Sequence, residues 1–260
     1  MANDKKFPSI NFEDILIAAC EFPYCKIDRD AFLTKQLKGN VSPELLMDAL
    51  ESGTINAGIP IDILDKLADG AINLETTKAA SLSAAAGIPG GFAILGAVPA
   101  DLAQFYAHVF RVAQKLAYIY GYKEISLDDA VQNVLMIFLG VMFGVNTATA
   151  ALAKLAAANA AKIGAKVAAK PLSKYAVYNV AKKVLAWISV KLTKDIAGKT
   201  VSKAVPIVGG VISGGLTVAT FLPMAKKLRK ELSKFAAMTP ENLEKATAEA
   251  DVVLAGFEII

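Results

Sequence analysis

The sequence predicts an all-α protein, a compact multi-helix bundle with long Ala- and Gly-rich apolar helices and hairpins broken by Gly and Pro. Two observations predict this class. Hydrophobic residues make up 55% of the 260-residue chain but aromatic residues only 8%, so the excess lies in aliphatic types that favour helices. Apolar residues also recur three and four positions apart, which is the spacing of one helix face. A chain of this length can bury a core without disulfides or metals.

The N-terminal region, residues 1–76, is acidic and predicts four helices. They are expected at residues 12–22, 30–37, 43–51 and 59–74. Ser42 is the expected cap of the third helix, with Pro at its first position. In the fourth helix the apolar positions recur at helical spacing, and the charged residues between them face outward. The apolar positions are Ile63, Leu64, Leu67, Ala71 and Leu74, and the outward ones are Asp62, Asp65, Lys66 and Asp69.

Three stretches without any charged residue follow, each long enough to cross a bilayer. They span residues 79–100, 130–153 and 204–225. Two prolines interrupt the first stretch and two the third, and the second is strongly apolar only over residues 134–145. The prolines are Pro89, Pro99, Pro206 and Pro223. These interruptions favour buried core helices over membrane insertion, and both interpretations stay open.

Each uncharged stretch contains a Gly-x-x-x-Gly pair, the spacing that lets two helix backbones approach closely. The pairs are Gly87/Gly91, Gly140/Gly144 and Gly210/Gly214. The first pair encloses a proline and predicts a turn, whereas the other two predict helix contacts in lipid or in a core. We expect the long helical pattern of residues 127–170 to bend or divide near residues 144–146. Gly53 lies in a polar connector, where we expect a larger side chain to be tolerated.

Charge is divided unevenly along the chain. Residues 1–130 hold 11 Lys and Arg against 17 Asp and Glu, residues 131–239 hold 16 against 2, and residues 240–260 hold 1 against 5. A basic and apolar block therefore lies between an acidic head and an acidic tail. Such a block fits the anionic cytoplasmic leaflet of a membrane better than it fits nucleic acid.

Two groups of basic residues in this block predict contacts with lipid phosphates. They are Lys162, Lys166, Lys170 and Lys174, and Lys226, Lys227, Arg229 and Lys230. The first group recurs every four residues, and a solvated helix face is the alternative explanation for it. The second group directly follows the third uncharged stretch, where basic residues are attracted to anionic leaflets.

Several classes of chemistry lack the residues they need. Cys20 and Cys25 are the only cysteines and His108 is the only histidine, so we expect reduced thiols and no metal site. No phosphate-loop, dinucleotide-binding or nucleophile-elbow motif occurs. The N-terminus does not read as a secretory leader, which predicts a protein of the cytoplasm. We therefore expect no cofactor and no nucleic-acid partner, and the sequence argues more against an enzyme than for one.

Residues 101–117 form a helical pattern that is apolar over most of its circumference. Its buried face is expected to hold Leu102, Phe105, Val109, Val112 and Leu116. One polar seam runs along it, consisting of Asp101, Gln104, His108, Arg111 and Lys115. Polar side chains on an extensively buried helix need partners or a ligand, so this seam is the candidate site.

Three interpretations of the polar seam stay open. One is a solvated edge or an internal network, for example with Asp101 paired to a Lys of another helix. Another is a site for an anionic lipid headgroup, in which Arg111 and Lys115 hold the phosphate. Gln104 and His108 would then donate hydrogen bonds, together with backbone N–H groups of a nearby turn. The turn residues are Gly87, Pro89, Gly90 and Gly91.

The third interpretation is catalysis, with Asp101 orienting His108 as a general base. These two residues are two turns apart on one helix, about 10 Å along its axis, which is too far for a direct hydrogen bond. The sequence also offers no recognisable nucleophile motif. Catalysis is therefore the least favoured of the three.

Residues 87–101, Gly-Ile-Pro-Gly-Gly-Phe-Ala-Ile-Leu-Gly-Ala-Val-Pro-Ala-Asp, continuing through 114–121, resemble the signature of the EcsC protein family. Residues 140–146 and 206–210 resemble its downstream half, and the likeness covers about residues 55–234. The family is named after a component encoded beside the ATPase and membrane subunits of an ABC-type exporter. The resemblance implies a bacterial, membrane-linked accessory role and brings no catalytic residue.

The sequence thus predicts a membrane-associated helical accessory protein that binds an anionic membrane surface or lipid and supports an ABC exporter or another membrane system. It would be peripheral to, or partly inserted in, the cytoplasmic face. The alternatives are a soluble helical module that encloses a lipid or apolar ligand, and a lipid-directed hydrolase that uses Asp101 and His108. We expect one structural domain with an acidic region at 1–76, an apolar and basic core at 77–240 and an acidic tail at 241–260. The oligomeric state is not indicated.

Overall fold

The computed structural model describes residues 11–86, 94–128, 133–161, 172–197 and 214–258. This part of the chain contains ten α-helices and no β-strand, which confirms the predicted all-α bundle. The helices are α1 (Phe12–Glu21), α2 (Arg29–Leu37), α3 (Pro43–Ser52), α4 (Ile61–Ala86), α5 (Ile94–Ile119), α6 (Val134–Phe143), α7 (Asn146–Ala161), α8 (Lys174–Ala197), α9 (Gly214–Ala236) and α10 (Pro240–Glu258).

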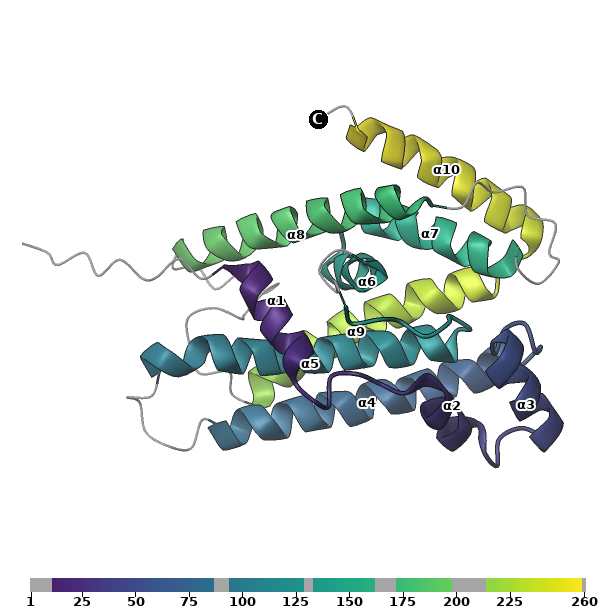
Figure 1. Ribbon diagram of the computed structural model, residues 1–260, viewed down its shortest axis with the longest axis horizontal. Coiled ribbons are helices and arrows are strands. Elements are labelled where there is room, and N and C mark those ends of the chain that lie inside the picture. Colours follow the sequence, from purple (N-terminus) through teal and green to yellow (C-terminus); the bar gives the residue numbers. More distant parts are fainter. Residues whose placement is uncertain (1–10, 87–93, 129–132, 162–171, 198–213, 259–260) are drawn as a thin grey trace, which may run out of the picture.

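The helices surround the short helix α6, which Figure 1 shows end-on at the centre of the molecule. α7 and α8 lie on one side of α6, and α5, α9 and α4 lie on the other. α10 packs along α7, and α1 packs across α5. Buried residues of α1 through α10 belong to one hydrophobic cluster, so the three regions that differ in charge share a core.

The short N-terminal helices begin where the sequence supplies caps. Side-chain oxygens of Asn11, Asp28 and Ser42 accept hydrogen bonds from backbone N–H groups in the first turns of α1, α2 and α3. These bonds satisfy donors that have no partner inside a helix. All three helices lie within one residue of their predicted ends, and Ser42 caps the third as expected.

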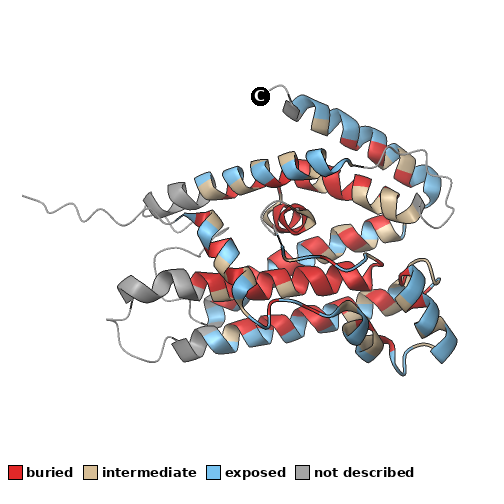
Figure 2. Ribbon diagram, in the orientation of Figure 1, coloured by how far each residue is buried: buried red, intermediate tan, exposed pale blue. Residues whose placement is uncertain are grey.

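The second uncharged stretch folds as two helices. α6 ends at Gly144, whose φ of 81° is left-handed, and α7 begins two residues later, as predicted for the division near residues 144–146. Every residue of α6 between positions 135 and 142 is buried, which Figure 2 shows in red. This apolar helix is therefore a core element. Among the described helices, none combines the length and apolarity that crossing a bilayer requires.

Two prolines lie inside helices, contrary to the prediction that they interrupt them. α5 starts five residues before Pro99, and α9 continues through Pro223. Pro223 cannot donate to the carbonyl of Ala219, but both residues are exposed, so water can bond to that carbonyl instead. The other two prolines, Pro89 and Pro206, lie outside the described residues.

Gly140 is the point where α6 approaches its neighbours most closely. A Cβ atom there would lie 2.5 Å from the Cβ of Ala148 and 2.9 Å from a methyl carbon of Val184. α6 thus packs backbone-close against α7 and α8, as predicted for this glycine pair. Gly144 has a different role, since it ends the helix and a Cβ there would meet the ammonium of Lys227. Gly87, Gly91 and Gly210 lie outside the described residues.

Gly53 contradicts the expectation that a larger side chain is tolerated there. Its φ is 98°, and a Cβ atom would lie 2.9 Å from the carbonyl oxygen of Gly121. Both the left-handed backbone and the collision disfavour other residues. Gly70 of α4 is exposed and would meet no atom within 4 Å, so it is the better neutral position.

α4 runs to Ala86, well past its predicted end at residue 74. Leu74, predicted to be apolar and inward, is 49% exposed. The buried stripe of α4 instead includes the carboxylate residue Glu75, which is fully buried. Its other members are Leu64, Ala68, Ala71, Ile72, Thr76 and Ala79.

Candidate functional site

The polar seam of α5 meets a single carboxylate, Glu75 of α4. α5 is buried at every position from 102 to 120 except Gln104 and Arg111, as its pattern predicts. Because α4 packs beside α5, their buried stripes face each other. His108, Arg111 and Lys115 all contact Glu75, and we call these four residues the Glu75 cluster.

Each oxygen of Glu75 accepts two hydrogen bonds. Oε2 lies 2.8 Å from His108 Nδ1 and 3.1 Å from Arg111 Nε. Oε1 lies 3.3 Å from Arg111 Nη2 and also accepts from Lys115 Nζ. The arginine therefore binds the carboxylate through two nitrogens, which is the strongest geometry for this pair. An ionised carboxylate only accepts, so His108 carries a proton on Nδ1.

The connector between α1 and α2 covers the cluster. The Tyr24 ring lies 5.6 Å from the His108 ring and 5.8 Å from the Arg111 guanidinium, whose Nη1 donates to the Tyr24 carbonyl. Gln114 fixes the same connector, because its amide donates to the carbonyl of Cys25 and accepts from the N–H of Ile27, at 3.0 and 3.1 Å. α1, α2, α4 and α5 are thus tied together at this point.

Burial and charge act against each other in the cluster. Burial is the largest influence on Glu75 and alone would raise its pKa, but hydrogen bonds from its three partners and the Lys115 charge hold that pKa far below its ordinary value. For Lys115 burial outweighs the attraction of Glu75, so its pKa lies below that of a free lysine. The Phe32 ring, 5.5 Å from the ammonium, offers Lys115 a second favourable contact.

Both cations of the seam already have acceptors inside the protein, and Glu75 lies where the phosphate of a lipid headgroup would bind. All three guanidinium nitrogens of Arg111 donate to Glu75 or Tyr24, and the Lys115 ammonium donates to Glu75. An anion at this place would have to displace a buried carboxylate. The geometry fits the internal-network interpretation. The carboxylate of this network is Glu75 of α4, whereas the sequence analysis suggested Asp101 of α5.

The catalytic interpretation gains a histidine–carboxylate pair but no reactive group. His108 Nε2 is buried, and within the described part of the chain nothing hydrogen-bonds to it. The recorded contacts of the ring are with Glu75 and Tyr24. Among the described residues, no group of three or more His, Cys, Asp or Glu side chains is arranged to hold a metal ion.

The remaining seam and turn residues are only partly described. Gln104 is partly exposed, and Asp101 belongs to α5 with a side chain that lies outside the description. Gly87, Pro89, Gly90 and Gly91 lie outside the described residues. The proposed contribution of their backbone N–H groups therefore stays a prediction.

The basic group of α9 is partly engaged inside the molecule. Arg229 pairs with Asp69 at 3.1 Å and with Asp65 at 3.5 Å, both on α4. Lys227 lies against Gly144 at the C-terminal end of α6, where the helix dipole favours a cation. The exposed residues Lys226 and Lys230 complete the group.

α8 presents a basic and aromatic surface, which we call the outward face of α8. Its exposed residues are Lys174, Tyr175, Tyr178, Lys182, Trp187 and Val190. Tyr175 is 73% exposed and Val190 53%. No Asp or Glu occurs anywhere in residues 130–194, so no carboxylate interrupts this face. Lys174 was predicted as a basic surface residue, and Lys162, Lys166 and Lys170 lie outside the described residues.

The outward face of α8 lies at one edge of the molecule. Figure 2 shows it in pale blue along the side opposite α4. The opposite side of α8 is buried against the core through Val180, Val184 and Ile188. Ser173 begins the helix, accepting a hydrogen bond from the N–H of Ala176 at 3.1 Å.

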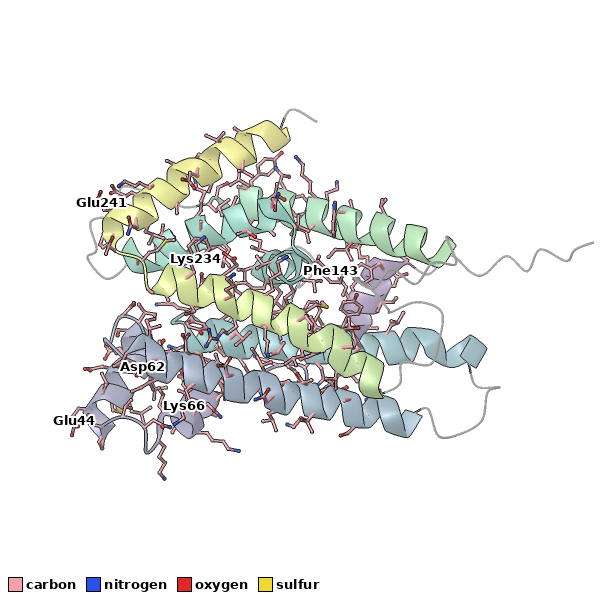
Figure 3. All side chains as sticks on the ribbon, turned by 180° about the vertical axis from the view of Figure 1, so that it is seen from behind. Glu44, Asp62, Lys66, Phe143, Lys234 and Glu241 are labelled. Atoms are coloured by element: carbon pink, nitrogen blue, oxygen red, sulfur yellow. The ribbon has the colours of Figure 1, made fainter. Side chains whose placement is uncertain are left out.

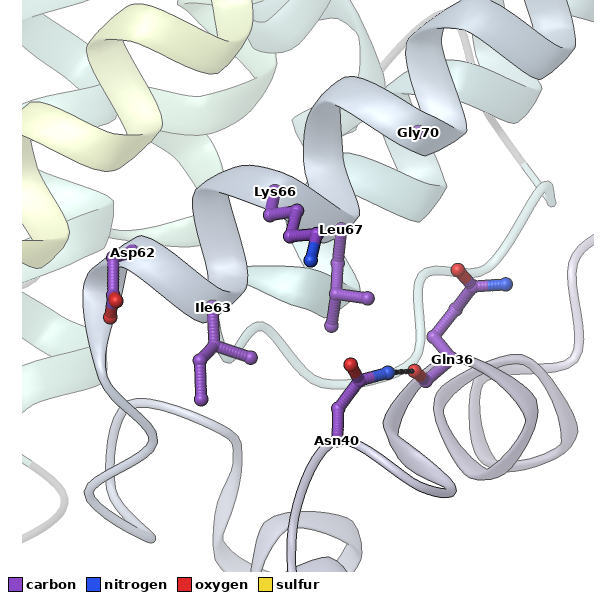
Figure 4. Close-up of a pocket in the computed structure, with 7 residues that line it drawn as sticks. All are labelled: Gln36, Asn40, Asp62, Ile63, Lys66, Leu67 and Gly70. Carbon is purple, nitrogen blue, oxygen red and sulfur yellow. Dashed lines mark hydrogen bonds between the residues drawn. The ribbon is translucent and has the colours of Figure 1, made fainter.

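The described clefts do not suit a lipid chain. One apolar cleft between the ends of α5, α7, α9 and α10 has a volume of about 200 Å³, whereas ligand sites usually reach roughly 300–1,000 Å³. A groove between α2 and α4 measures about 380 Å³, and Figure 4 shows Ile63 and Leu67 pointing across it toward Asn40. A third cleft, about 600 Å³, has more carboxylates than cations and so disfavours anions. Its charged residues are Asp28, Arg29, Asp30, Glu51, Lys123 and Glu124.

Comparisons with protein families, curated proteins and solved structures give no match to this chain. The resemblance to the EcsC family therefore stays a prediction that rests on the quoted residues.

Sequence reasoning missed two features that matter here. Glu75 could have been found by extending the buried stripe of α4, since it lies three residues after Ile72 and four before Ala79. The outward face of α8 could have been found from Tyr175, Tyr178 and Trp187, which accompany lysines in a long stretch without acids.

Proposed function

We propose that this protein binds the surface of an anionic membrane through the outward face of α8. In this proposal it is a membrane-associated helical accessory protein of the EcsC type, located at the cytoplasmic face of a bacterial membrane. It would support an ABC exporter or another membrane system by being held at that surface.

One observation carries the proposal: between residues 174 and 190, α8 exposes aromatic and aliphatic side chains together with lysines, and this stretch contains no carboxylate. Tyrosine and tryptophan favour the membrane interface because one end of the ring system is apolar and the other polar. Lysine stems lie along apolar surface while their ammonium groups reach lipid phosphates. A helix with these two properties on one face lies in the plane of the interface.

The outward face of α8 is better suited to membrane binding than the basic group of α9. Arg229 of α9 pairs with Asp65 and Asp69 of α4, and these two carboxylates would repel anionic lipid. The outward face of α8 has no such neighbour on its own helix as far as residue 194. We therefore assign the main contact to α8 and a secondary one to Lys226 and Lys230.

Co-sedimentation with vesicles tests the proposal. The protein is expected to bind phosphatidylglycerol-containing vesicles more tightly than pure phosphatidylcholine vesicles, and less tightly as salt rises. Lys174→Glu combined with Lys182→Glu should weaken binding to the anionic vesicles at least about 30-fold. Each lysine near an anionic leaflet contributes about 1 kcal/mol, and two of them are removed.

Lys35→Glu combined with Lys66→Glu is the matched control. Both lysines are exposed on α2 and α4, and the change in net charge is the same. The proposal requires that this control binds nearly as well as the unaltered protein. Equal binding to both kinds of vesicle, or an equal loss in the control, would overturn it.

The enclosed-ligand alternative has weaker support. The apolar cleft among the described residues is small, and Arg111 and Lys115 of the Glu75 cluster are paired with a carboxylate. Native mass spectrometry of the purified protein tests this alternative, because a lipid that stays bound to the protein would favour an enclosed ligand. The hydrolase alternative depends on His108, which is buried beneath Tyr24 with no described nucleophile bonded to it.

A further inference from the structure

The helix α10 is acidic and lies on the same side of the molecule as α8. It carries five carboxylate residues against one lysine. Figure 1 shows α8 and α10 both on the side of α6 that is opposite α4. The exposed acids of α10 include Glu241, Glu249 and Asp251. Carboxylates in this place oppose the attraction between α8 and an anionic leaflet.

The apolar contact that holds α10 in place is small. Among the described helices, α7 is the one against which α10 packs extensively. Over residues 240–256 the buried side chains are Leu243, Thr247 and Ala250, which recur at the spacing of one helix face. Of these three only Leu243 is a large apolar residue, and it also borders the apolar cleft of about 200 Å³. A helix with so few buried apolar contacts is one that can open locally while the core stays folded.

An ion pair also joins α10 to α7. The ammonium of Lys154 on α7 donates to the carboxylate of Asp251 on α10. The Lys154 side chain is only 8% exposed, whereas that of Asp251 is 59% exposed. A cation buried to this degree needs its acceptor, so the pair favours the docked position of α10. Lys154 is the only charged residue of α7.

We propose that α10 is a releasable acidic helix, which the Lys154–Asp251 pair holds on α7 and which anionic lipid displaces. The inference rests on the proposed function, because α8 supplies the membrane contact. Movement about residues 237–239, of which two are exposed, takes the carboxylates of α10 away from the membrane side and uncovers Lys154. Both changes strengthen the attraction to anionic lipid. By linkage, a membrane that binds the released form more tightly also favours release.

Hydrogen exchange of the full chain, followed by mass spectrometry with and without phosphatidylglycerol-containing vesicles, tests the release. Backbone amides of residues 240–258 are expected to exchange at least about tenfold faster on the vesicles, whereas those of α9 keep their protection. Slow exchange of α10 in protein that co-sediments with the vesicles would overturn the release and leave the membrane contact of α8 intact. Protein that co-sediments with neither kind of vesicle would overturn both proposals.

Asp251→Asn tests the ion pair, and Glu249→Gln is its matched control. Each variant removes one negative charge from an exposed residue of α10, but no ion pair of Glu249 occurs among the described residues. Asp251→Asn should speed the exchange of α10 in the free protein and raise the affinity for phosphatidylglycerol-containing vesicles about threefold more than the control does. Equal effects of the two variants on exchange and on affinity would contradict the proposed role of the pair.

Discussion

At the scale of single residues, the stability of the fold depends strongly on Glu75. A fully buried carboxylate is tolerated only when its charge and lone pairs are satisfied, and Glu75 accepts four hydrogen bonds from three side chains. The cations need the acid as well, because without Glu75 the buried Lys115 and the partly buried Arg111 would lie side by side with no carboxylate between them. Removing one member of the cluster should therefore destabilise the fold, because the remaining charges lose their partners.

Glu75→Gln should lower the free energy of unfolding by about 3–5 kcal/mol at neutral pH, since it leaves the buried Lys115 and the partly buried Arg111 without a carboxylate. Arg111→Met should cost less, about 1–3 kcal/mol, because Glu75 keeps His108 and Lys115. Urea unfolding of the three proteins measures the difference. A Glu75→Gln variant as stable as the unaltered protein would show that the cluster contributes little.

The same residue predicts a pH dependence of stability. The folded pKa of Glu75 is depressed, so its contribution is fully present above the unfolded pKa of about 4.3 and is lost as the pH falls toward the folded value. The stability gap between the unaltered protein and Glu75→Gln should therefore be constant above about pH 5 and narrow below about pH 4. Urea unfolding at several acidic pH values checks this, and a gap that widens in acid would contradict it.

The residues of the seam were predictable, and their partner was not. Arg111 and Lys115 could be identified because polar residues on an apolar helix need partners. Glu75 was missed because its helix was predicted to end at residue 74. A residue beyond the predicted end could not be assigned to the buried or the exposed side of that helix. Only the packing of α4 on α5 places the carboxylate, and a single sequence does not contain that distance.

At the scale of helices, the core is organised by the position of α6. Its apolar composition and length predicted a buried helix. The division of the long helical pattern near Gly144 was also predicted from the sequence. Pro99 and Pro223 were misjudged because proline disfavours a helix interior but does not forbid it where neighbours or water compensate. The outward face of α8 was not predicted, although Tyr175, Tyr178 and Trp187 beside lysines indicate it, because the sequence analysis followed the lysine spacing alone.

Gly140→Ala should destabilise the protein by about 1–3 kcal/mol, because the new methyl group would collide with Ala148 and Val184. Gly70→Ala is the control for the change of residue type. It lies on an exposed helix surface with no atom nearby, and alanine should raise stability there by up to about 1 kcal/mol. Thermal unfolding of both variants compares them. Equal melting temperatures would show that α6 does not need the glycine.

At the scale of the whole molecule, the outward face of α8 lies away from the acidic surface of α2, α3 and α4, while α10, which packs along α7, also exposes acids such as Glu241 and Glu249. The outward face of α8 is basic, whereas exposed acids gather on α2, α3 and α4, where Figure 3 labels Glu44 and Asp62 away from α8. An anionic membrane would attract the first surface and repel the second. These two surfaces favour an orientation with α8 toward the membrane, and this orientation can be tested at a single position on α8.

Trp187 is that position, because it is the only tryptophan in the chain and is a 40% exposed member of the outward face of α8. Its fluorescence emission, titrated with phosphatidylglycerol-containing vesicles, is the most direct measurement of the proposed contact. We predict a shift to shorter wavelength and quenching by brominated acyl chains, both reversed by high salt and both absent with pure phosphatidylcholine. Unchanged emission from protein that co-sediments with the anionic vesicles would place the contact elsewhere and contradict the assignment to α8.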